Sequence, residues 1–300
     1  MAFKSGFATI VGRPNVGKST LVNSLVGDKI SIISSKPQTT RNTIKAIVSK
    51  ENYQIIFVDT PGIHKPKNKL GEHMVTSAIG TLEEVDAVIM MVEATDSKPG
   101  PGDLYILEQL KKIRTPVFLL INKIDLVNKE QVLNVINQYK DLLDFQAVIP
   151  ISALNLDGID EIIKELLKVI PEGPKYFPDD SVTDQPETLI VAEFIREKAL
   201  HYLEDEVPHG IGVEVTSFKE RKDKNIIDIQ ANIYCEKNSH KGILIGKNGS
   251  MLKKIGSSAR MDIERLLGAK VFLELWVKVK EDWRNSISML KTLGYSSYDK

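Results

Sequence analysis

The 300-residue sequence has almost no cysteine, no excess of charge of either sign and no long hydrophobic run. A single cysteine, Cys235, excludes an intramolecular disulfide and a cysteine-rich metal site, and it is typical of a reducing compartment. Lysine and arginine number 40 and aspartate and glutamate number 40, so the chain as a whole is not a polycation that coats nucleic acid. Any nucleic-acid site must therefore be local.

The hydrophobic runs are too short for a membrane span. Segments 87–92 and 117–121 are among the longest, and both fall far below the roughly 18 apolar residues that cross a bilayer. The first five residues lack the apolar region of a signal peptide. We expect a soluble, cytoplasmic protein with at most a peripheral membrane contact, and its length suggests two domains.

A glycine-rich loop follows the apolar run 6–11 and opens a helix near residue 18. This GxxxxGK[ST] pattern directs backbone N–H groups and a helix N-terminus at one phosphate, which indicates a P-loop. Lys18 can reach the β- and γ-phosphate oxygens, and the Ser19 hydroxyl can bind Mg²⁺. The residues expected to bind the nucleotide here are Gly12, Arg13, Pro14, Asn15, Val16, Gly17, Lys18 and Ser19.

Two further segments are expected beside the phosphates. The polar stretch 27–42 reads as a loop, in which Thr40 or Thr39 could reach the metal. The apolar strand 53–59 ends in Asp59, which can hold Mg²⁺ through a water, and a nearby glycine N–H can donate to the γ-phosphate. We expect the catalytic residues to be Lys18, Thr40, Asp59 and Gly62, with Thr60, Pro61 and Ile63 also beside the nucleotide.

Apolar strands alternate with helical patterns through the first half of the chain. Strands are expected at 43–49, 53–59, 87–92, 116–121 and 147–151, and helices at 70–84, 103–113, 129–143 and 159–169. This alternation predicts an α/β fold with a doubly wound, mostly parallel sheet that binds ligands at the carboxyl ends of its strands.

Two of those strand ends indicate guanine recognition. The Asp125 carboxylate can accept from guanine N1–H and N2–H₂, whereas adenine has no N–H at N1, so the site selects GTP over ATP. Asn122 can support the base edge, the Lys123 stem can lie over the ring, and the Ala153 N–H can donate to guanine O6. The residues expected around the base are Asn122, Lys123, Ile124, Asp125, Ser152 and Ala153.

The segments GRPNVGKS, QTTRN, DTPG, NKID and SA together resemble the five motifs of translation-factor-type GTPases, which implies GTP or GDP with Mg²⁺. Asn15 resembles the asparagine with which potassium-activated members hold K⁺. Ile63 stands where Ras-like enzymes carry a water-orienting glutamine, and an apolar side chain cannot polarise water. The sequence is thus similar to the hydrophobic-substituted GTPases, which implies slow intrinsic hydrolysis.

The second half predicts a separate RNA-binding domain. Its expected elements are a helix at 187–205, strands at 211–219 and 226–235, a helical turn near 242–245, a helix at 250–267 and a strand at 270–279. Between residues 237 and 260 there are six basic residues and no acidic one. A GxxG loop within this window can clamp a single-stranded backbone. The expected RNA-binding residues are Lys241, Gly246, Lys247, Asn248, Gly249, Lys253 and Lys254.

The order of these elements resembles a type II KH domain. We therefore expect a P-loop GTPase domain at 1–170, a proline-rich linker at 171–186, an α+β KH domain at 187–280 and a C-terminal helix and tail at 281–300. In that last helix Trp283, Ile287, Leu290 and Leu293 recur at helical spacing, which predicts core packing.

As a set, these motifs resemble the Era-like family of bacterial GTPases over essentially the whole chain. The resemblance implies a monomeric, GTP-dependent factor for small (30S) ribosomal subunit assembly that binds 16S rRNA near its 3′ end. It also implies a peripheral association with the cytoplasmic face of the cell membrane.

Two other functions stay open at this point. One is an RNA-binding scaffold whose nucleotide is structural, although the full set of metal and γ-phosphate positions argues against it. The other is a tRNA-directed GTPase, which would need a catalytic cysteine or cofactor site, and Cys235 within a strand is a poor candidate.

Overall fold

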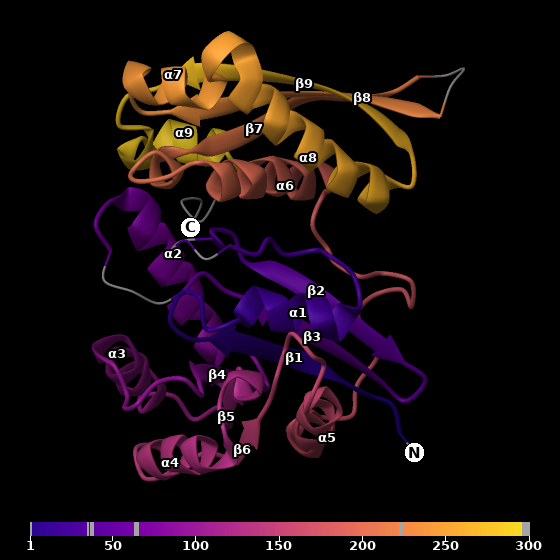
Figure 1. The fold of residues 1–300 in the computed structure, drawn as a ribbon. Coiled ribbons are helices and arrows are strands. Elements are labelled where there is room, and N and C mark those ends of the chain that lie inside the picture. Colours follow the sequence, from indigo (N-terminus) through magenta and orange to yellow (C-terminus); the bar gives the residue numbers. More distant parts are fainter. Residues whose placement is uncertain (1, 35, 37–38, 63–65, 222–224, 296–300) are drawn as a thin grey trace. The chain divides into compact units, whose positions relative to one another are not determined.

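The structure, a computed structural model, describes residues 2–34, 36, 39–62, 66–221 and 225–295 (Figure 1). It divides into two compact units. The first comprises residues 1–31, 40–66 and 71–184, and the second comprises residues 32–39, 67–70 and 185–300. The segment 32–39 of the second unit thus comes from the polar stretch that the sequence places beside the phosphates.

The first unit contains a six-stranded sheet in the order β2-β3-β1-β4-β5-β6. All neighbouring strands are parallel except β2 and β3. The mixed, mostly parallel sheet predicted from the sequence is confirmed. Its strands are β1 (Lys4–Val11), β2 (Ile44–Lys50), β3 (Tyr53–Asp59), β4 (Ala87–Glu93), β5 (Val117–Asn122) and β6 (Ala147–Pro150).

Helices cover both faces of this sheet, which is why β5 is buried along its whole length. One face packs against α1 and α5, and the other packs against α2, α3 and α4. The two cores therefore fix the strand ends that carry the site. The helices are α1 (Lys18–Val26), α2 (Lys69–Gly80), α3 (Pro101–Leu110), α4 (Lys129–Tyr139) and α5 (Ile159–Val169).

Several predicted helix ends differ from the observed ones. Helix α3 begins at Pro101 rather than at 103, because proline is favoured in the first helical turn and Asp103 accepts from the Gly100 N–H to cap the helix. Helix α2 ends at Gly80 and continues only as a 3-10 turn over Thr81–Glu83. Helix α4 ends at Tyr139, four residues before its predicted end at 143.

The segment predicted as a linker makes hydrogen bonds to the first unit along much of its length. The Ile47 N–H of edge strand β2 donates to the Val182 carbonyl at 3.0 Å. The buried Gln54 side chain accepts from the Tyr176 N–H and donates to the Phe177 carbonyl, both at 2.8 Å. These contacts cover the edge of the sheet, and the boundary between the units falls after residue 184.

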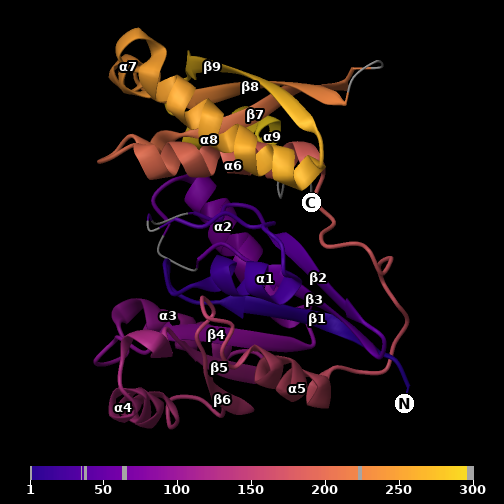
Figure 2. The same cartoon turned by 45° about the vertical axis from the view of Figure 1, so that its right-hand side comes forward.

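The second unit is built on a three-stranded sheet in the order β7-β8-β9, with β7 antiparallel and β9 parallel to β8. Helices α6 and α8 lie side by side on one face of this sheet (Figure 2). The predicted α-β-β-α-α-β order is confirmed. The elements are α6 (Glu187–Tyr202), β7 (Gly212–Glu220), β8 (Ile226–Cys235), α7 (Asn238–Ile245), α8 (Ser250–Leu267), β9 (Lys270–Val279) and α9 (Ile287–Thr292).

The C-terminal stripe is only partly buried. Trp283 is fully buried and donates its indole N–H to the Gly210 carbonyl at 2.8 Å, and Leu290 and Leu293 are also buried. Ile287 is 41% exposed, so the core prediction is wrong there. The reason is that the segment is a 3-10 turn followed by α9, not one continuous helix.

Ile32, Ile33 and Thr39 contact other residues of the second unit. Ile32 is buried in the core of that unit, and the Ile33 N–H donates to Glu197 of α6 at 2.9 Å. The fully buried Arg196 pairs with Glu193 and donates to the Thr39 carbonyl. Helix α6 thus holds the chain immediately before Thr40.

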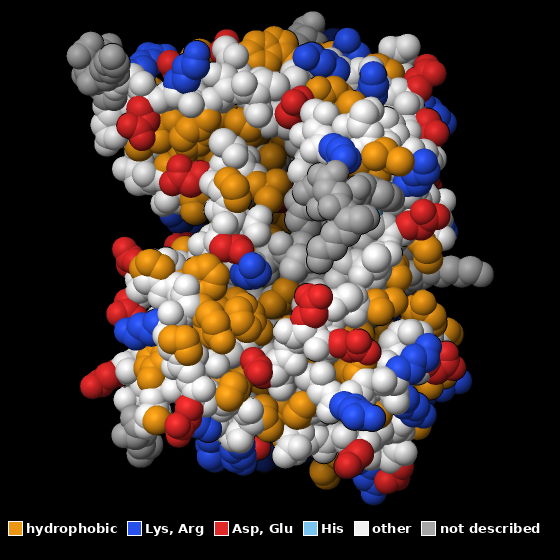
Figure 3. All heavy atoms as spheres, turned by 180° about the vertical axis from the view of Figure 1, so that it is seen from behind, with side chains coloured by type: hydrophobic (Ala, Val, Ile, Leu, Met, Phe, Trp, Pro, Cys, Tyr) orange, Lys and Arg blue, Asp and Glu red, His pale blue; other side chains and the backbone are white. Residues whose placement is uncertain are grey.

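Within the described part of the chain, no helix has the length and apolar character needed to cross a membrane. On the face shown in Figure 3, side chains of both charges are interspersed with hydrophobic ones. This distribution agrees with the balanced composition, so an anion site has to be formed locally.

Candidate nucleotide and RNA sites

The phosphate loop, residues 12–17, connects β1 to α1 and requires glycine at both ends. Gly17 has a φ of 105°, and a Cβ there would lie 2.2 Å from the Asn122 amide nitrogen. A Cβ on Gly12 would lie 2.5 Å from the Met91 carbonyl oxygen. Any side chain at either position would displace the loop from β4 and β5.

Lys18 is buried beneath this loop. Its Nζ donates to the Gly12 carbonyl at 2.9 Å and to the Arg13 carbonyl at 2.8 Å. Burial lowers the pKa of Lys18 to about 8, while the charge of Asp59 acts in the opposite direction. The ammonium lies next to Gly62, since a Cβ on that glycine would be 3.6 Å from Nζ. Two of the predicted catalytic residues are therefore neighbours.

The predicted metal ligands also converge. The Ser19 and Thr40 hydroxyl oxygens are 3.0 Å apart, and Ser19 donates to Asp59 Oδ2 at 3.3 Å. Thr39 instead donates to the Lys36 carbonyl at 2.6 Å, which favours Thr40 as the threonine of this site. Burial raises the pKa of Asp59, against the lowering effects of Lys18 and two serine hydroxyls.

These groups suit Mg²⁺. Asp59 Oδ1 is buried and has no hydrogen-bond partner among the described residues, so one carboxylate oxygen is available to a metal-bound water. No cluster of three histidine, cysteine or acidic side chains that could hold a metal occurs within the described ranges. A small octahedral ion that keeps waters and phosphate oxygens as ligands fits two hydroxyls and one carboxylate.

Ser31 is a site residue that the sequence prediction missed. It donates to Asp59 Oδ2 at 2.9 Å and is fully buried. Asn23 of α1 holds it there, accepting from the Ser31 N–H at 2.9 Å and donating to the Ser31 carbonyl at 2.8 Å. No spacing rule reveals this contact, because it depends on how the polar loop folds back onto α1.

At the base end, Asn122 joins the two loops that would enclose guanine. It donates to the Val16 carbonyl at 2.8 Å and accepts from the Ala153 N–H at 2.9 Å. The Ala153 N–H, predicted to reach guanine O6, therefore donates to Asn122 in this structure. Ser24 of α1 fixes the same loop by donating to the Ala153 carbonyl at 2.7 Å.

The Asp125 side chain is exposed in a short 3-10 turn, Ile124–Leu126. Lys123, with a φ of 67°, begins this turn and forms an ion pair with Glu93 at the end of β4. Ser152 is buried, and its hydroxyl accepts from the Asn155 N–H at 3.2 Å. Ile63, predicted to stand beside the γ-phosphate, lies outside the described residues.

The remaining residues predicted to bind the nucleotide differ in burial. Thr60 is buried and donates to the Ile10 carbonyl at 3.0 Å, and the Ile124 N–H donates to the Ile151 carbonyl at 3.2 Å. Pro61 and Val16 are buried, while Pro14 is half-buried and Asn15 is exposed.

The GxxG loop, Gly246–Gly249, connects α7 to α8. Its backbone has φ values of 72° at Gly246, 51° at Asn248 and 77° at Gly249. A Cβ on Gly246 would lie 2.8 Å from the Met251 nitrogen, so this glycine is needed for the turn itself. A Cβ on Gly249 would meet nothing within 4 Å, which leaves space there for an approaching backbone.

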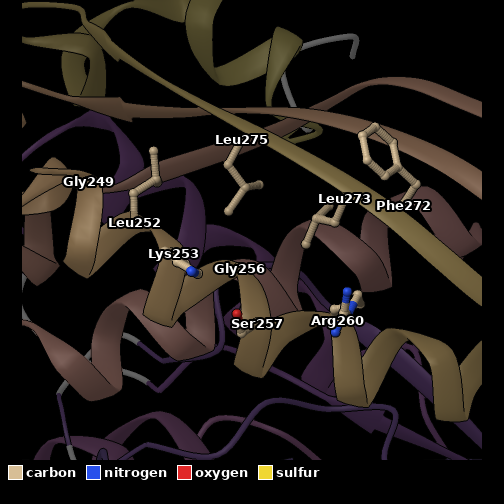
Figure 4. A pocket seen from close by; sticks show the side chains of 9 residues that line it. All are labelled: Gly249, Leu252, Lys253, Gly256, Ser257, Arg260, Phe272, Leu273 and Leu275. Carbon is tan, nitrogen blue, oxygen red and sulfur yellow. The ribbon is translucent and has the colours of Figure 1, made fainter.

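A cleft of about 380 Å³ continues from this loop between α8 and β9 (Figure 4). One side carries the cations of α8 and the other carries apolar side chains of β9, among which Phe272 is 51% exposed. Such a cleft can take bases on its apolar side and phosphates on its cationic side. Its lining consists of Gly249, Leu252, Lys253, Gly256, Ser257, Arg260, Phe272, Leu273 and Leu275.

The structure thus separates the predicted RNA-binding lysines. Lys253 lines the cleft, whereas the Lys254 ammonium lies 4.2 Å from the centre of the Tyr202 ring on α6. Lys241, on α7, and Lys247, in the loop, are not among the lining residues. Arg260, which closes the acid-free window 237–260, also lines the cleft, although it is not among the expected RNA-binding residues. Phe272 was not predicted, although an aromatic side chain on the polar face of a strand is a detectable signal.

Cys235 is buried in β8, and this burial raises the pKa of its thiol. A buried, protonated thiol is a poor nucleophile, which argues against a cysteine-dependent reaction.

Comparison with known proteins matches both units. Residues 7–123 match the family model of the 50S ribosome-binding GTPase, and residues 206–284 match that of the KH domain. The chain is 63% identical over 297 residues to the GTPase Era of Ruminiclostridium cellulolyticum, with 99% of each chain covered. It is 60% identical over 295 residues to the GTPase Era of Alkaliphilus metalliredigens, covering 98% of this chain and 100% of the relative.

Two solved structures match the fold over nearly the full length. A variant of Aquifex aeolicus Era bound to GDP and AlF₄⁻ superposes with a TM-score of 0.94 at 42% identity, covering 98% of this chain and 100% of that one. Era in complex with MgGDPNP and nucleotides 1506–1542 of 16S ribosomal RNA gives the same TM-score and identity, covering 98% and 99%.

Proposed function

Because this chain belongs to the Era family of GTPases, we propose that it uses GTP hydrolysis in assembling the small ribosomal subunit, by binding 16S rRNA near its 3′ end. The observation that carries the proposal is the cationic and apolar cleft that continues from the GxxG loop. A relative at 42% identity, solved with MgGDPNP and nucleotides 1506–1542 of 16S rRNA, supports it.

For hydrolysis, the residues of the site would bind different parts of the triphosphate and its Mg²⁺ ion. From its place beside the Gly12 and Arg13 carbonyls, the Lys18 ammonium would donate to the β- and γ-phosphate oxygens, where negative charge develops. Ser19 and Thr40 would hold Mg²⁺ directly, with Asp59 acting through a water, and the ion would neutralise that charge. The Gly62 N–H would bind the γ-phosphate.

We include slow intrinsic turnover and K⁺ stimulation in the proposal. Asn15, with a φ of 69°, lies on the exposed side of the phosphate loop, where its amide oxygen could share a cation with the β- and γ-phosphates. K⁺ would then supply positive charge where an arginine finger acts in other GTPases. We expect faster hydrolysis in KCl than in NaCl, and a smaller difference for Asn15→Ala. Equal rates in the two salts would contradict a K⁺ site.

The RNA assignment is tested by crosslinking the protein to cellular RNA and mapping the contacts. Contacts concentrated near the 3′ end of 16S rRNA are expected, whereas contacts mainly on tRNA would favour the tRNA-directed alternative. Measured GTP turnover separates the enzyme from an RNA-binding scaffold with a structural nucleotide.

We predict different roles for two adjacent lysines of α8. Lys253→Ala should weaken binding of single-stranded RNA of any sequence and reduce the slope of log K against log salt by about 0.7, because one phosphate contact is lost. Lys254→Ala is the matched control, since that ammonium lies over Tyr202 and outside the cleft lining. Salt titrations of both variants measure the difference, and equal slopes would contradict the assignment.

Nucleotide control of RNA binding is also part of the proposal. Thr40 belongs to the metal site, while the preceding carbonyl, that of Thr39, accepts from Arg196 of α6. A movement of Thr40 on binding or loss of the γ-phosphate would therefore also move Thr39, which is hydrogen-bonded to α6. A monomeric state, a cytoplasmic location and a peripheral membrane contact complete the proposal. The membrane contact is implied by the family resemblance, and the location also agrees with the composition.

A further inference from the structure

The side chain of Arg13, the second residue of the phosphate loop, is held by the β4–α3 connection. Its Nε donates to Asp103 Oδ1 at 2.8 Å, and its Nη2 forms an ion pair with Asp96. The Asp103 side chain is fully buried in the first turn of α3, where its other oxygen accepts from the Gly100 N–H at 3.0 Å. One carboxylate thus caps α3 and binds the phosphate loop.

The packing around Arg13 favours this direction of its side chain. A Cβ on Gly102 would lie 2.9 Å from Arg13 Cδ, so a glycine at this position lets the stem lie against α3. Burial disfavours the charge on Arg13, but Asp103 and Asp96 outweigh it and raise the pKa of the guanidinium. Arg13 therefore stays charged.

The main chain of the same residue contacts Lys18. The Arg13 carbonyl accepts from the Lys18 ammonium at 2.8 Å, so the side chain and the carbonyl fix the loop from two sides. The backbone at Asp96, the second partner of Arg13, is also held in place, because Gln131 of α4 donates to the Asp96 carbonyl at 3.1 Å and to the Ala94 carbonyl at 3.4 Å. A continuous series of contacts thus runs from α4 through Arg13 to Lys18.

We propose that Arg13, clamped by Asp103 and Asp96, is a positioning residue for GTP hydrolysis, which sets the backbone of the phosphate loop and thereby the place of Lys18. The guanidinium itself does not touch the nucleotide. This inference rests on the GTPase activity assigned above. Because the chemical step is more sensitive than ground-state binding to a small displacement of Lys18, the clamp acts on turnover more than on nucleotide affinity.

The test compares single-turnover GTP hydrolysis with GDP affinity. Arg13→Ala should lower the hydrolysis rate about tenfold or more, since small displacements of catalytic groups are costly, while GDP affinity changes less than about threefold. Arg13→Lys should not restore the rate, because one ammonium cannot reproduce the guanidinium fork. Asp103→Asn retains the size and the capping oxygen but removes the charge, and it should show a similar loss.

The double variant Arg13→Ala/Asp103→Asn distinguishes a clamp from general damage to the fold. If the two residues act through each other, the double variant loses no more activity than the more damaged single variant. Glu161→Gln, which breaks an exposed ion pair with Lys164 on α5, is the charge control and should keep the wild-type rate. All rates are divided by the nucleotide-binding fraction, so that unfolded protein does not contribute.

Three results would overturn the inference: a wild-type rate in Arg13→Ala, additive losses in the double variant, or equal losses of rate and GDP affinity. If the wild-type protein itself does not hydrolyse GTP, the assigned activity fails instead, and the two failures are thereby distinguished.

Discussion

Asp125→Asn is expected to change the base preference of the protein from guanine to xanthine. The exposed carboxylate of the 124–126 turn would accept two N–H groups of guanine, and its amide replacement can accept only one and must donate beside the other. Losing one hydrogen bond to a charged acceptor costs about 1.5–3 kcal/mol, so GTP affinity should fall by a factor of roughly 10 to 150. Xanthine, with an oxygen at C2, suits the new donor.

Competition between GTP and XTP measures this change. Glu130→Gln removes a neighbouring exposed charge at the start of α4 and serves as the control, with unchanged guanine preference expected. Retention of guanine preference in Asp125→Asn would show that another group reads the base.

Gly249→Asp is expected to cause the largest loss of RNA binding, by roughly a factor of 100. The glycine lines the mouth of the cleft, and the open space beside it would be filled by a side chain that also repels phosphate. A Cβ there meets no protein atom within 4 Å, and aspartate is one of the few residues that adopt a φ near 77° at modest cost, so the fold should survive the replacement.

Gly249→Asn separates the two causes. Asparagine has nearly the same size and tolerates the φ of 77°, but it carries no charge. We expect it to retain more RNA affinity than the aspartate variant. Equal affinity of both variants and the wild type for single-stranded RNA would move the RNA site away from the GxxG loop.

Much of the fold follows from local sequence patterns. The observed β3, α5, β8, α8 and β9 have the predicted bounds, because each is a strongly periodic or continuously apolar segment limited by glycine, proline or polar residues. Errors occur where local side chains set a helix boundary, as at the Asp103 cap that begins α3 and the break between Trp283 and α9.

The proximity of the phosphate loop, Asp59 and Asn122 could be predicted because each stands at the end of a strand, and the strand order brings those ends together. The contacts among them could not be predicted. Asn122 bridges two loops, Ser31 reaches Asp59, and segment 32–39 joins the second unit. All three depend on long-range packing, for which a single sequence contains no periodic signal.

At the RNA site, too, the sequence could not distinguish the two adjacent lysines of α8, Lys253 and Lys254. A charge count treats Lys253 and Lys254 alike, but neighbouring helical residues point about 100° apart, so only one of them faces the cleft. The position of Tyr202 on another helix decides the role of the second lysine.

The most direct test of the account is a titration of a single-stranded 3′-terminal 16S rRNA fragment against the protein loaded with GDP or with a non-hydrolysable GTP analogue. Coupling free energies between two sites are typically about 1–3 kcal/mol, so we predict roughly 5- to 150-fold tighter binding in the GTP-analogue form. Equal affinities in the two nucleotide states, or equal affinity for a scrambled RNA of the same length, would contradict a GTP-dependent factor that acts on this end of the rRNA.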